Sequence, residues 1–140
     1  MSNITHAQLV EQAIAAASHS HSPYSQFRVG AALLASDGRV FVGTNIENAS
    51  YGLTLCAERS AFGTAITAGA RTFAAIAIVA SGDEPSLPCG ACRQVMAEFC
   101  DGELTVLLAS INSPDKIQTY NLDALLPHAF TLKENPQPTE

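Results

Sequence analysis

Three of the four cysteines stand where a folded chain can bring them together. Cys89 and Cys92 form a Cys-x-x-Cys pair directly after Pro88, at the start of a predicted helix, and Cys56 lies at the start of another predicted helix. The N-terminus of a helix stabilises anions, so both places favour the thiolate, which is the form of cysteine that binds zinc. The chain is therefore predicted to fold so that two helix starts meet at one zinc ion.

The fourth cysteine, Cys100, is predicted to stay out of this site. It lies eight residues beyond Cys92, which is roughly 12 Å along a helix. Because zinc–sulfur bonds are about 2.3 Å long, one ion cannot bind both sulfurs unless the helix breaks. Cys100 is therefore interpreted as a buried structural thiol. Three protein ligands leave one zinc position open for water, which is typical of catalytic zinc sites.

Glu58 is the candidate proton carrier of the site. It follows Cys56 by two residues, so it can reach the open zinc position without binding the metal. A carboxylate there can take a proton from water and deliver it to a substrate. Glu58 has a plainer interpretation, as a glutamate that suits the dipole of its helix. Cys89 and Cys92 also have another interpretation, as a thioredoxin-like redox pair. The redox interpretation explains neither Cys56 nor Glu58.

The apolar pattern predicts an α/β chain. Phe73–Ala80 is a continuous apolar run, consistent with a strand covered on both faces, and Asp37–Gly38 is typical of a hairpin turn. Helices are predicted over residues 6–18, 55–68 and 89–99, strands over 27–35, 39–44, 73–80, 103–109 and 117–120, and a short helix from residue 123. This order predicts a three-layer αβα sandwich with a mixed five-stranded sheet and helices on both faces. We expect one domain, residues 1–132, and a polar tail, residues 133–140.

Capping residues mark the predicted helix ends. Thr5 and Gln8 have the spacing of a capping box. Thr54 is predicted to cap the second helix and Gly69 to end it. Pro88 is predicted to be the first position of the third helix.

Composition and charge narrow the partners. The chain is 47% hydrophobic and 14% charged, which is typical of a globular protein with much buried surface, some of it between subunits. Its net charge is −6 and its seven basic residues are scattered, which disfavours nucleic acid as a partner. The first twelve residues do not resemble a signal peptide, and no apolar stretch approaches the ~20 residues of a membrane span. A cytoplasmic location is expected, where cysteines stay reduced.

These residues match a known pattern. Cys56–Glu58 and Pro88–Cys92 have the spacing of the zinc deaminases, His/Cys-x-Glu followed by Pro-Cys-x-x-Cys. The all-cysteine version, with Arg59 following and Arg93 closing, is similar to the small homotetrameric cytidine deaminases. The resemblance runs from about Pro23 to Phe130, and its further motifs are Tyr24–Phe27, Val29–Ala32, Asn45–Tyr51 and Leu125–Phe130.

The resemblance implies a nucleoside site. Phe27 would pack against the pyrimidine ring, Asn45 and Glu47 would bind ribose hydroxyls, and the backbone of Ala57 would contact the base. Each residue also has a plainer interpretation, with Phe27 in the core of a strand and Asn45 and Glu47 in a turn.

The resemblance also implies that subunits share their active sites. Tyr51 and Phe130 would complete the pocket of a neighbouring subunit in a homotetramer, although both could be ordinary interface or core aromatics.

Arg59 is predicted to tune the metal. Three thiolates and one Zn²⁺ leave a charge of −1, which weakens the power of the metal to acidify water. A guanidinium that donates hydrogen bonds to the sulfurs restores that power. A surface arginine beside Glu58 is the alternative, and Arg93 is a second candidate for the tuning role.

The function that the resemblance implies is pyrimidine salvage: hydrolytic deamination of cytidine and 2′-deoxycytidine to uridine and 2′-deoxyuridine, with release of ammonia. Water activated by one zinc ion per subunit attacks the ring, and Glu58 carries the protons. A deaminase of a cytosine-nucleoside antibiotic of the blasticidin S type is the nearest alternative, disfavoured by Asn45–Glu47. A non-enzymatic zinc-stabilised interaction domain is the alternative from another class, and it predicts a fourth protein ligand.

Overall fold

The computed structural model describes residues 4–132. The predicted tail, residues 133–140, lies outside the described residues, so the division of the chain into a domain and a tail stays a prediction. Within the described range the strands are β1 (Val29–Ala35), β2 (Val40–Thr44), β3 (Phe73–Ala80), β4 (Thr105–Ser110) and β5 (Ser113–Asn121). The helices are α1 (His6–Ala17), α2 (Ala57–Thr67), α3 (Gly90–Phe99) and α4 (Leu122–Leu125), with a 3₁₀ turn, η1 (Tyr51–Leu53).

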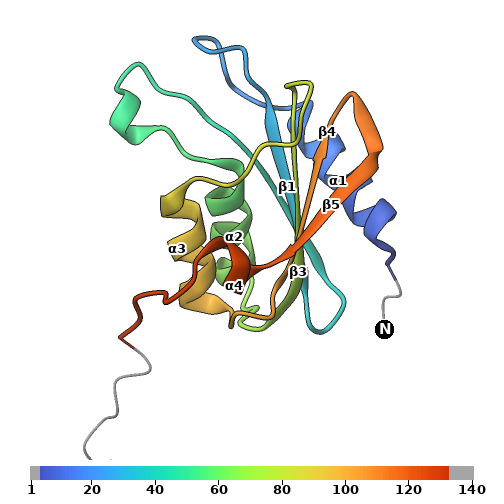
Figure 1. The fold of residues 1–140 in the computed structure, drawn as a ribbon. Coiled ribbons are helices and arrows are strands. Elements are labelled where there is room, and N and C mark those ends of the chain that lie inside the picture. The colour runs from blue at the N-terminus through green and yellow to red at the C-terminus, as the bar shows by residue number, and fades with distance from the viewer. Residues whose placement is uncertain (1–3, 133–140) are drawn as a thin grey trace, which may run out of the picture.

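The strands form one mixed five-stranded sheet in the order β2-β1-β3-β4-β5. Only β3 and β4 pair in parallel, through a crossover that contains α3, and the other neighbours are antiparallel. Figure 1 shows α1 on one face of this sheet and α2 and α3 on the other. The predicted three-layer α/β fold is confirmed.

Alternation along β3 explains why both faces of the sheet are covered. Ile76 and Ile78 pack into the core under α2 and α3, whereas Ala77 and Val79 pack into the core under α1. Successive side chains of a strand point to opposite faces, so an unbroken apolar run buries side chains on both. The interpretation of Phe73–Ala80 as a doubly covered strand is confirmed.

A close backbone approach fixes α2 against the edge of the sheet. A Cβ atom placed on Gly43 of β2 would lie 2.4 Å from the Ala61 nitrogen and 2.6 Å from the Ala57 oxygen. Contacts of that length do not exist in real structures, so only glycine allows α2 to pack this near to β2. The start of α2 therefore lies beside the chain that leaves β2.

The predicted helix ends are partly correct. Thr5 and Gln8 form the capping box of α1, with both reciprocal hydrogen bonds present, and Gly69 adopts a positive φ of 96° after α2. The caps of the next two helices were predicted too early. Cys56, not Thr54, is the N-cap of α2, and Cys89 is the N-cap of α3, so Pro88 lies just outside that helix.

Four of the five predicted strands differ from the structure in their bounds, and the first and the last of them matter most. The first strand begins at Val29, so Phe27 lies in the preceding loop and not in the core of a strand. The last strand spans Ser113–Asn121 and is longer than predicted. It is an edge strand and mostly exposed, so it tolerates Pro114 and lacks the apolar alternation that marks a half-buried strand.

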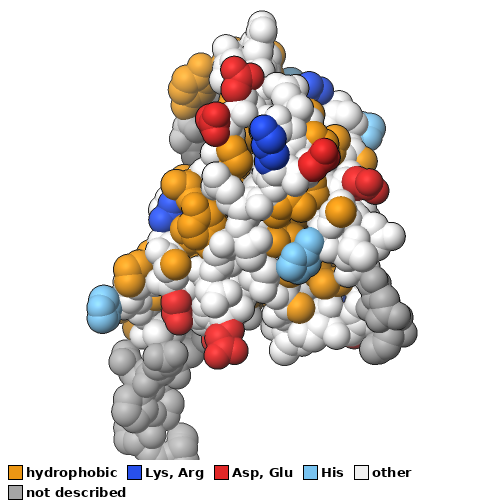
Figure 2. All heavy atoms as spheres, turned by 45° about the vertical axis from the view of Figure 1, so that its right-hand side comes forward, with side chains coloured by type: hydrophobic (Ala, Val, Ile, Leu, Met, Phe, Trp, Pro, Cys, Tyr) orange, Lys and Arg blue, Asp and Glu red, His pale blue; other side chains and the backbone are white. Residues whose placement is uncertain are grey.

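Among residues 4–132 no helix is both long and apolar enough to cross a membrane. On the face of the molecule that Figure 2 shows, the Lys and Arg side chains lie apart from one another, with acidic side chains between them.

Candidate active site

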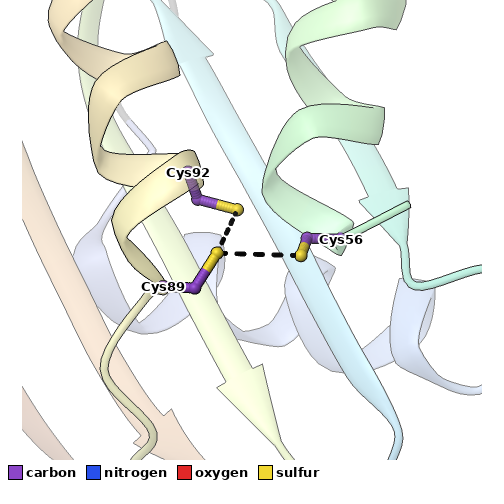
Figure 3. Close-up of side chains that lie close together, drawn as sticks. All are labelled: Cys56, Cys89 and Cys92. Carbon is purple, nitrogen blue, oxygen red and sulfur yellow. Dashed lines mark hydrogen bonds between the residues drawn. The ribbon is translucent and has the colours of Figure 1, made fainter. Parts of the chain in front are cut away.

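Three sulfur atoms converge between the starts of α2 and α3. The Sγ atoms of Cys56 and Cys89 are 4.0 Å apart, and those of Cys89 and Cys92 are 3.4 Å apart. All three lie within 4.8 Å of one another, and they form the only such group of candidate metal ligands among the described residues. Figure 3 shows the three side chains pointing toward a common centre from two helices.

The spacing of these sulfurs fits a tetrahedral zinc ion. Sulfurs bound to one tetrahedral zinc at about 2.3 Å lie about 3.8 Å apart. The observed separations of 3.4 and 4.0 Å bracket that value. An all-thiolate donor set is also one that zinc prefers. The site therefore fits one zinc ion held by three thiolates, and no fourth candidate ligand from residues 4–132 belongs to the group.

The local fold explains why these sulfurs face one another. Cys56 and Cys89 are N-cap residues with extended backbone, and neither side chain caps its helix. Neither sulfur therefore accepts a capping hydrogen bond from the backbone at the start of its own helix, and Cys92 stands one turn later on α3. Both helix N-termini point their partial positive charge at the cluster, which stabilises the thiolates.

Arg59 lies against the cluster, as predicted. Its Nη2 atom donates to the Cys56 sulfur at 3.4 Å and to the Thr54 carbonyl at the same distance. Hydrogen bonds from the Cys92 thiol and from Arg59 lower the pKa of Cys56 to about 5. The hydrogen bond to Cys56, together with burial, raises the pKa of Cys92. Without metal, Cys56 is therefore the thiol that ionises first and Cys92 keeps its proton. A bound divalent cation takes the place of such protons.

Glu58 is a buried carboxyl beside the cysteines. Glu58 is 5% exposed, and it lies near Cys56 and Cys92. Burial, supported by the nearby Cys56 thiolate, raises its pKa to about 7. A carboxyl with this pKa accepts and releases protons near neutral pH, which suits a general acid–base group.

Arg93 and Cys100 do not join the cluster. Arg93 donates to the carbonyl of Pro88 at 2.8 Å and to that of Leu125 at 2.6 Å, so it ties the loop before α3 to the C-terminal segment. These contacts do not support the prediction that Arg93 is a second residue that tunes the metal. Cys100 follows an unbroken α3 at the helix end remote from Cys89 and is partly buried against the core, not fully buried.

Three loops meet beside the cysteine cluster. Leu55 and Ile46 exchange two backbone hydrogen bonds of 2.9 Å, which places Asn45 and Glu47 beside the start of α2. His21 bridges to the same segment: its nitrogen donates to the Asn45 carbonyl and its carbonyl accepts from the Glu47 nitrogen. Figure 1 shows these loops and the one following β3 at the same end of the sheet.

Asn45 and Glu47 both bind the loop that precedes β1. The Oδ1 atom of Asn45 accepts from the Ser20 hydroxyl at 2.6 Å and from the Val29 nitrogen at 3.0 Å. Glu47 accepts from the Tyr24 nitrogen at 3.0 Å, from the Ser25 nitrogen at 3.2 Å and from the Ser25 hydroxyl. These side chains are structural as well as candidate ribose ligands. The sequence interpretation assigned no role to Ser20 or Ser25, although Ser25 lies within a quoted motif.

The other candidate substrate residues differ in exposure. Phe27 is 37% exposed, and its ring edge faces Gly82. Ala57 is fully buried as the first residue of α2. Tyr51 and Phe130 are 68% and 69% exposed. Tyr51 packs edge-on against Tyr24 with ring centroids 5.8 Å apart. The structure therefore gathers Phe27, Asn45, Glu47 and Ala57 around the cysteines' end of the sheet, and leaves the two aromatics open on the surface of the chain.

The chain belongs to the family described as the cytidine and deoxycytidylate deaminase zinc-binding region, whose model matches residues 3–108. A curated relative, a cytidine deaminase from Halalkalibacterium halodurans, is 51% identical over 126 residues, covering 90% of this chain and 94% of its own. Family and cysteine cluster together fit one zinc ion per chain, as predicted.

Solved structures show the same architecture. A cytidine deaminase from Burkholderia pseudomallei superposes with a TM-score of 0.86 at 49% identity, covering 91% of this chain and 100% of that one. A cytidine deaminase from Mycobacterium tuberculosis gives a TM-score of 0.80 at 40% identity, with coverage of 93% and 100%. The α/β fold and its five-stranded sheet are therefore those of known cytidine deaminases.

The cysteine geometry predicts which thiols hold the metal. Replacing Cys92 by Ala removes one of three thiolates, so the purified variant should retain well under one zinc per chain. Cys100→Ala is the matched control, because that thiol lies at the far end of α3, and it should retain one. Elemental analysis measures zinc per chain directly. Full zinc in Cys92→Ala, or its loss in Cys100→Ala, would contradict the assigned ligand set.

Proposed function

We propose that this protein hydrolyses cytidine and 2′-deoxycytidine to uridine and 2′-deoxyuridine with release of ammonia, a reaction of pyrimidine salvage. The single observation that carries the proposal is a buried glutamate beside three converging cysteines, which are the only candidate metal group among the described residues. The curated relative named above is a cytidine deaminase, which favours a cytosine nucleoside as substrate over an antibiotic of the blasticidin S type. A cytoplasmic location goes with the proposal, because free thiolates need a reducing compartment.

Glu58 is the proton carrier in this proposal. Bound zinc supplies Lewis-acid chemistry, which makes water a nucleophile near neutral pH. The Glu58 carboxylate accepts a proton from that water and delivers it to nitrogen 3 of the pyrimidine. After oxygen has added to carbon 4, Glu58 takes the remaining proton from that hydroxyl as the carbonyl forms and passes it to the amino group, which leaves as ammonia. The raised pKa of the buried Glu58 side chain suits both transfers.

The loops beside the metal are proposed to hold the nucleoside. Phe27 packs against the pyrimidine ring, and the backbone of Ala57 contacts the base. Asn45 and Glu47 bind ribose hydroxyls. Their support is the backbone bridge between Ile46 and Leu55, which holds the segment that contains both residues beside the chain that enters α2. Their hydrogen bonds to the preceding loop hold each side chain in place before substrate arrives.

A homotetramer with shared active sites is proposed for the assembly. Tyr51 and Phe130 are large aromatics left mostly exposed by one chain, and each would complete a neighbour's pocket. The Nε atom of Arg59 is also buried without a hydrogen-bond partner among the described residues, and a buried donor of this kind favours an added acceptor. Both observations support a site that one chain leaves incomplete.

Glu58→Gln tests the proton carrier. The amide is similar in size to the carboxyl and keeps the metal, but it cannot accept a proton from water, so turnover should fall by several orders of magnitude, at least about 10³-fold. The loss of cytidine absorbance in the ultraviolet measures turnover, and elemental analysis checks zinc. Glu11→Gln, on the exposed face of α1, is the control and should match the wild type. Near-normal turnover in Glu58→Gln would overturn the assignment.

Arg59→Ala tests the tuning of the metal. Without the guanidinium the thiolate charge is uncompensated and the site is a weaker Lewis acid, so activity should fall about 10- to 100-fold. A more negative site loses protons less readily, so the acid-side limb of the pH–rate profile should move to higher pH. Arg59→Lys should lie between, and Arg71→Ala, at the other end of α2, is the control. An unchanged rate and profile in Arg59→Ala would refute the tuning role but leave the zinc ligands standing.

Mixing two inactive variants tests the shared sites. Glu58→Gln lacks the proton carrier, and Phe130→Ala lacks the aromatic that a neighbour would receive. In random mixed tetramers from equal co-expression, about a quarter of the sites combine an intact Glu58 with a neighbour's intact Phe130. Activity should therefore recover to about that fraction of wild type, in particles four times the mass of one chain by light scattering. Activity equal to the mean of the separate variants would mean that Phe130 serves its own chain.

A further inference from the structure

The hydroxyl of Ser25 links two parts of the candidate nucleoside site. It donates a hydrogen bond to the Oε2 atom of Glu47 and accepts one from the backbone nitrogen of Phe27 at 3.0 Å. Glu47 is the candidate ribose ligand and Phe27 the candidate partner of the base. One exposed side chain therefore contacts both residues.

The contacts of Glu47 show how strongly Ser25 fixes that carboxylate. Its Oε1 atom accepts from the backbone nitrogens of Tyr24 and Ser25 at 3.0 and 3.2 Å, while its Oε2 atom accepts from the Ser25 hydroxyl. The two residues are 22 positions apart in the chain, so this is a tertiary contact between two loops. Hydrogen bonds to an ionised group are among the stronger ones, and the Ser25 hydroxyl is the main cause of the lowered pKa of Glu47.

Both backbone polar groups of Phe27 form hydrogen bonds with side chains. Its nitrogen donates to the Ser25 hydroxyl, and its carbonyl accepts from the Nδ2 atom of Asn45 at 2.8 Å. Gln26, just before it, has a positive φ of 57°. A non-glycine residue in this region needs surrounding contacts to hold it. The Ser25 hydroxyl is one of those contacts, so it sets the direction from which Phe27 leaves the loop.

We propose that Ser25 is a positioning residue that orients Glu47 toward the ribose and couples this carboxylate to Phe27. The inference rests on the proposed function, because it needs a nucleoside in the site. Ser25 acts through Glu47, so its contribution depends on the ribose hydroxyls of the substrate. A serine that only stabilised the loop would affect every substrate alike.

Steady-state kinetics on the zinc-loaded enzyme separate these roles. Ser25→Ala should raise the KM for cytidine about tenfold with little change in kcat, since a hydrogen bond to a charged group is lost before the chemical step. For 2′,3′-dideoxycytidine, which lacks the 2′ and 3′ hydroxyls, the same change should raise KM less than about threefold. The part of the effect that remains with this substrate reports Phe27. Ser25→Thr keeps a hydroxyl and should restore the cytidine KM. Ser18→Ala, at the start of the same loop, is the matched control.

A double variant tests the coupling to Glu47. In a Glu47→Gln background, Ser25→Ala should cause less than about a twofold further rise in KM, because the group that it orients is already altered. Additive effects would overturn the inference. So would an equal loss for both nucleosides that Ser25→Thr does not rescue, or an unchanged KM in Ser25→Ala.

The inference and the proposed function fail in different ways. If the wild-type enzyme leaves cytidine intact, the proposed function falls, and the role of Ser25 falls with it. If the wild type converts cytidine and only the Ser25 results disagree, the function stands and the positioning role alone is wrong.

Discussion

The convergence of two helix N-termini is the constraint around which the site is arranged. Three thiolates in one place repel one another and need compensation before they can hold a metal. The starts of α2 and α3 supply aligned dipoles, Arg59 supplies a full positive charge, and the metal supplies the rest. The absence of a side chain on Gly43 lets α2 lie close against β2, so the packing of the sheet edge determines where Cys56 and Glu58 stand.

A second set of contacts organises the loops around that centre. Asn45 and Glu47 leave β2 and bind the segment between α1 and β1 through side-chain hydrogen bonds. Loops in general are mobile, but the loop between α1 and β1 is hydrogen-bonded to residues 45–47, and Ile46 of this segment pairs with Leu55, just before α2. A chain of hydrogen bonds therefore fixes the positions of the candidate base and ribose residues relative to the start of α2. Their positions do not depend on the sheet alone.

The features that the sequence predicted correctly are those with a strong local signal. The apolar run of Phe73–Ala80 can only be buried on two faces, and the Cys-x-x-Cys spacing after Pro88 brings two sulfurs to one side of a helix start. Helix bounds were less accurate. Thr54 is an ordinary capping residue, yet Cys56 takes the cap because the chain first forms η1 and pairs with Ile46. Tertiary pairing of that kind leaves no local signal.

The role of Ser25 was beyond sequence reasoning for a related reason. Serine in a polar loop is typical of any turn, and nothing local shows that its hydroxyl meets a carboxylate 22 positions away. The strand bounds at Phe27 show the same limit. The predicted strand covers residues 27–35, but the sheet begins only where β1 pairs with its neighbours, with β3 from Val29 and with β2 from Gly30.

The candidate catalytic residues and the candidate substrate-binding residues thus lie on different kinds of structural element. The groups proposed to act on the reacting atoms, Glu58 and the cysteines, lie at the starts of packed helices, where a small displacement would cost activity most. The candidate substrate contacts lie on loops fixed by polar side chains, and the exposed aromatics Tyr51 and Phe130 lie farther out still, unburied by their own chain. A fold arranged in this way can keep its catalytic geometry constant while its loops and neighbours determine which ring and which sugar fit.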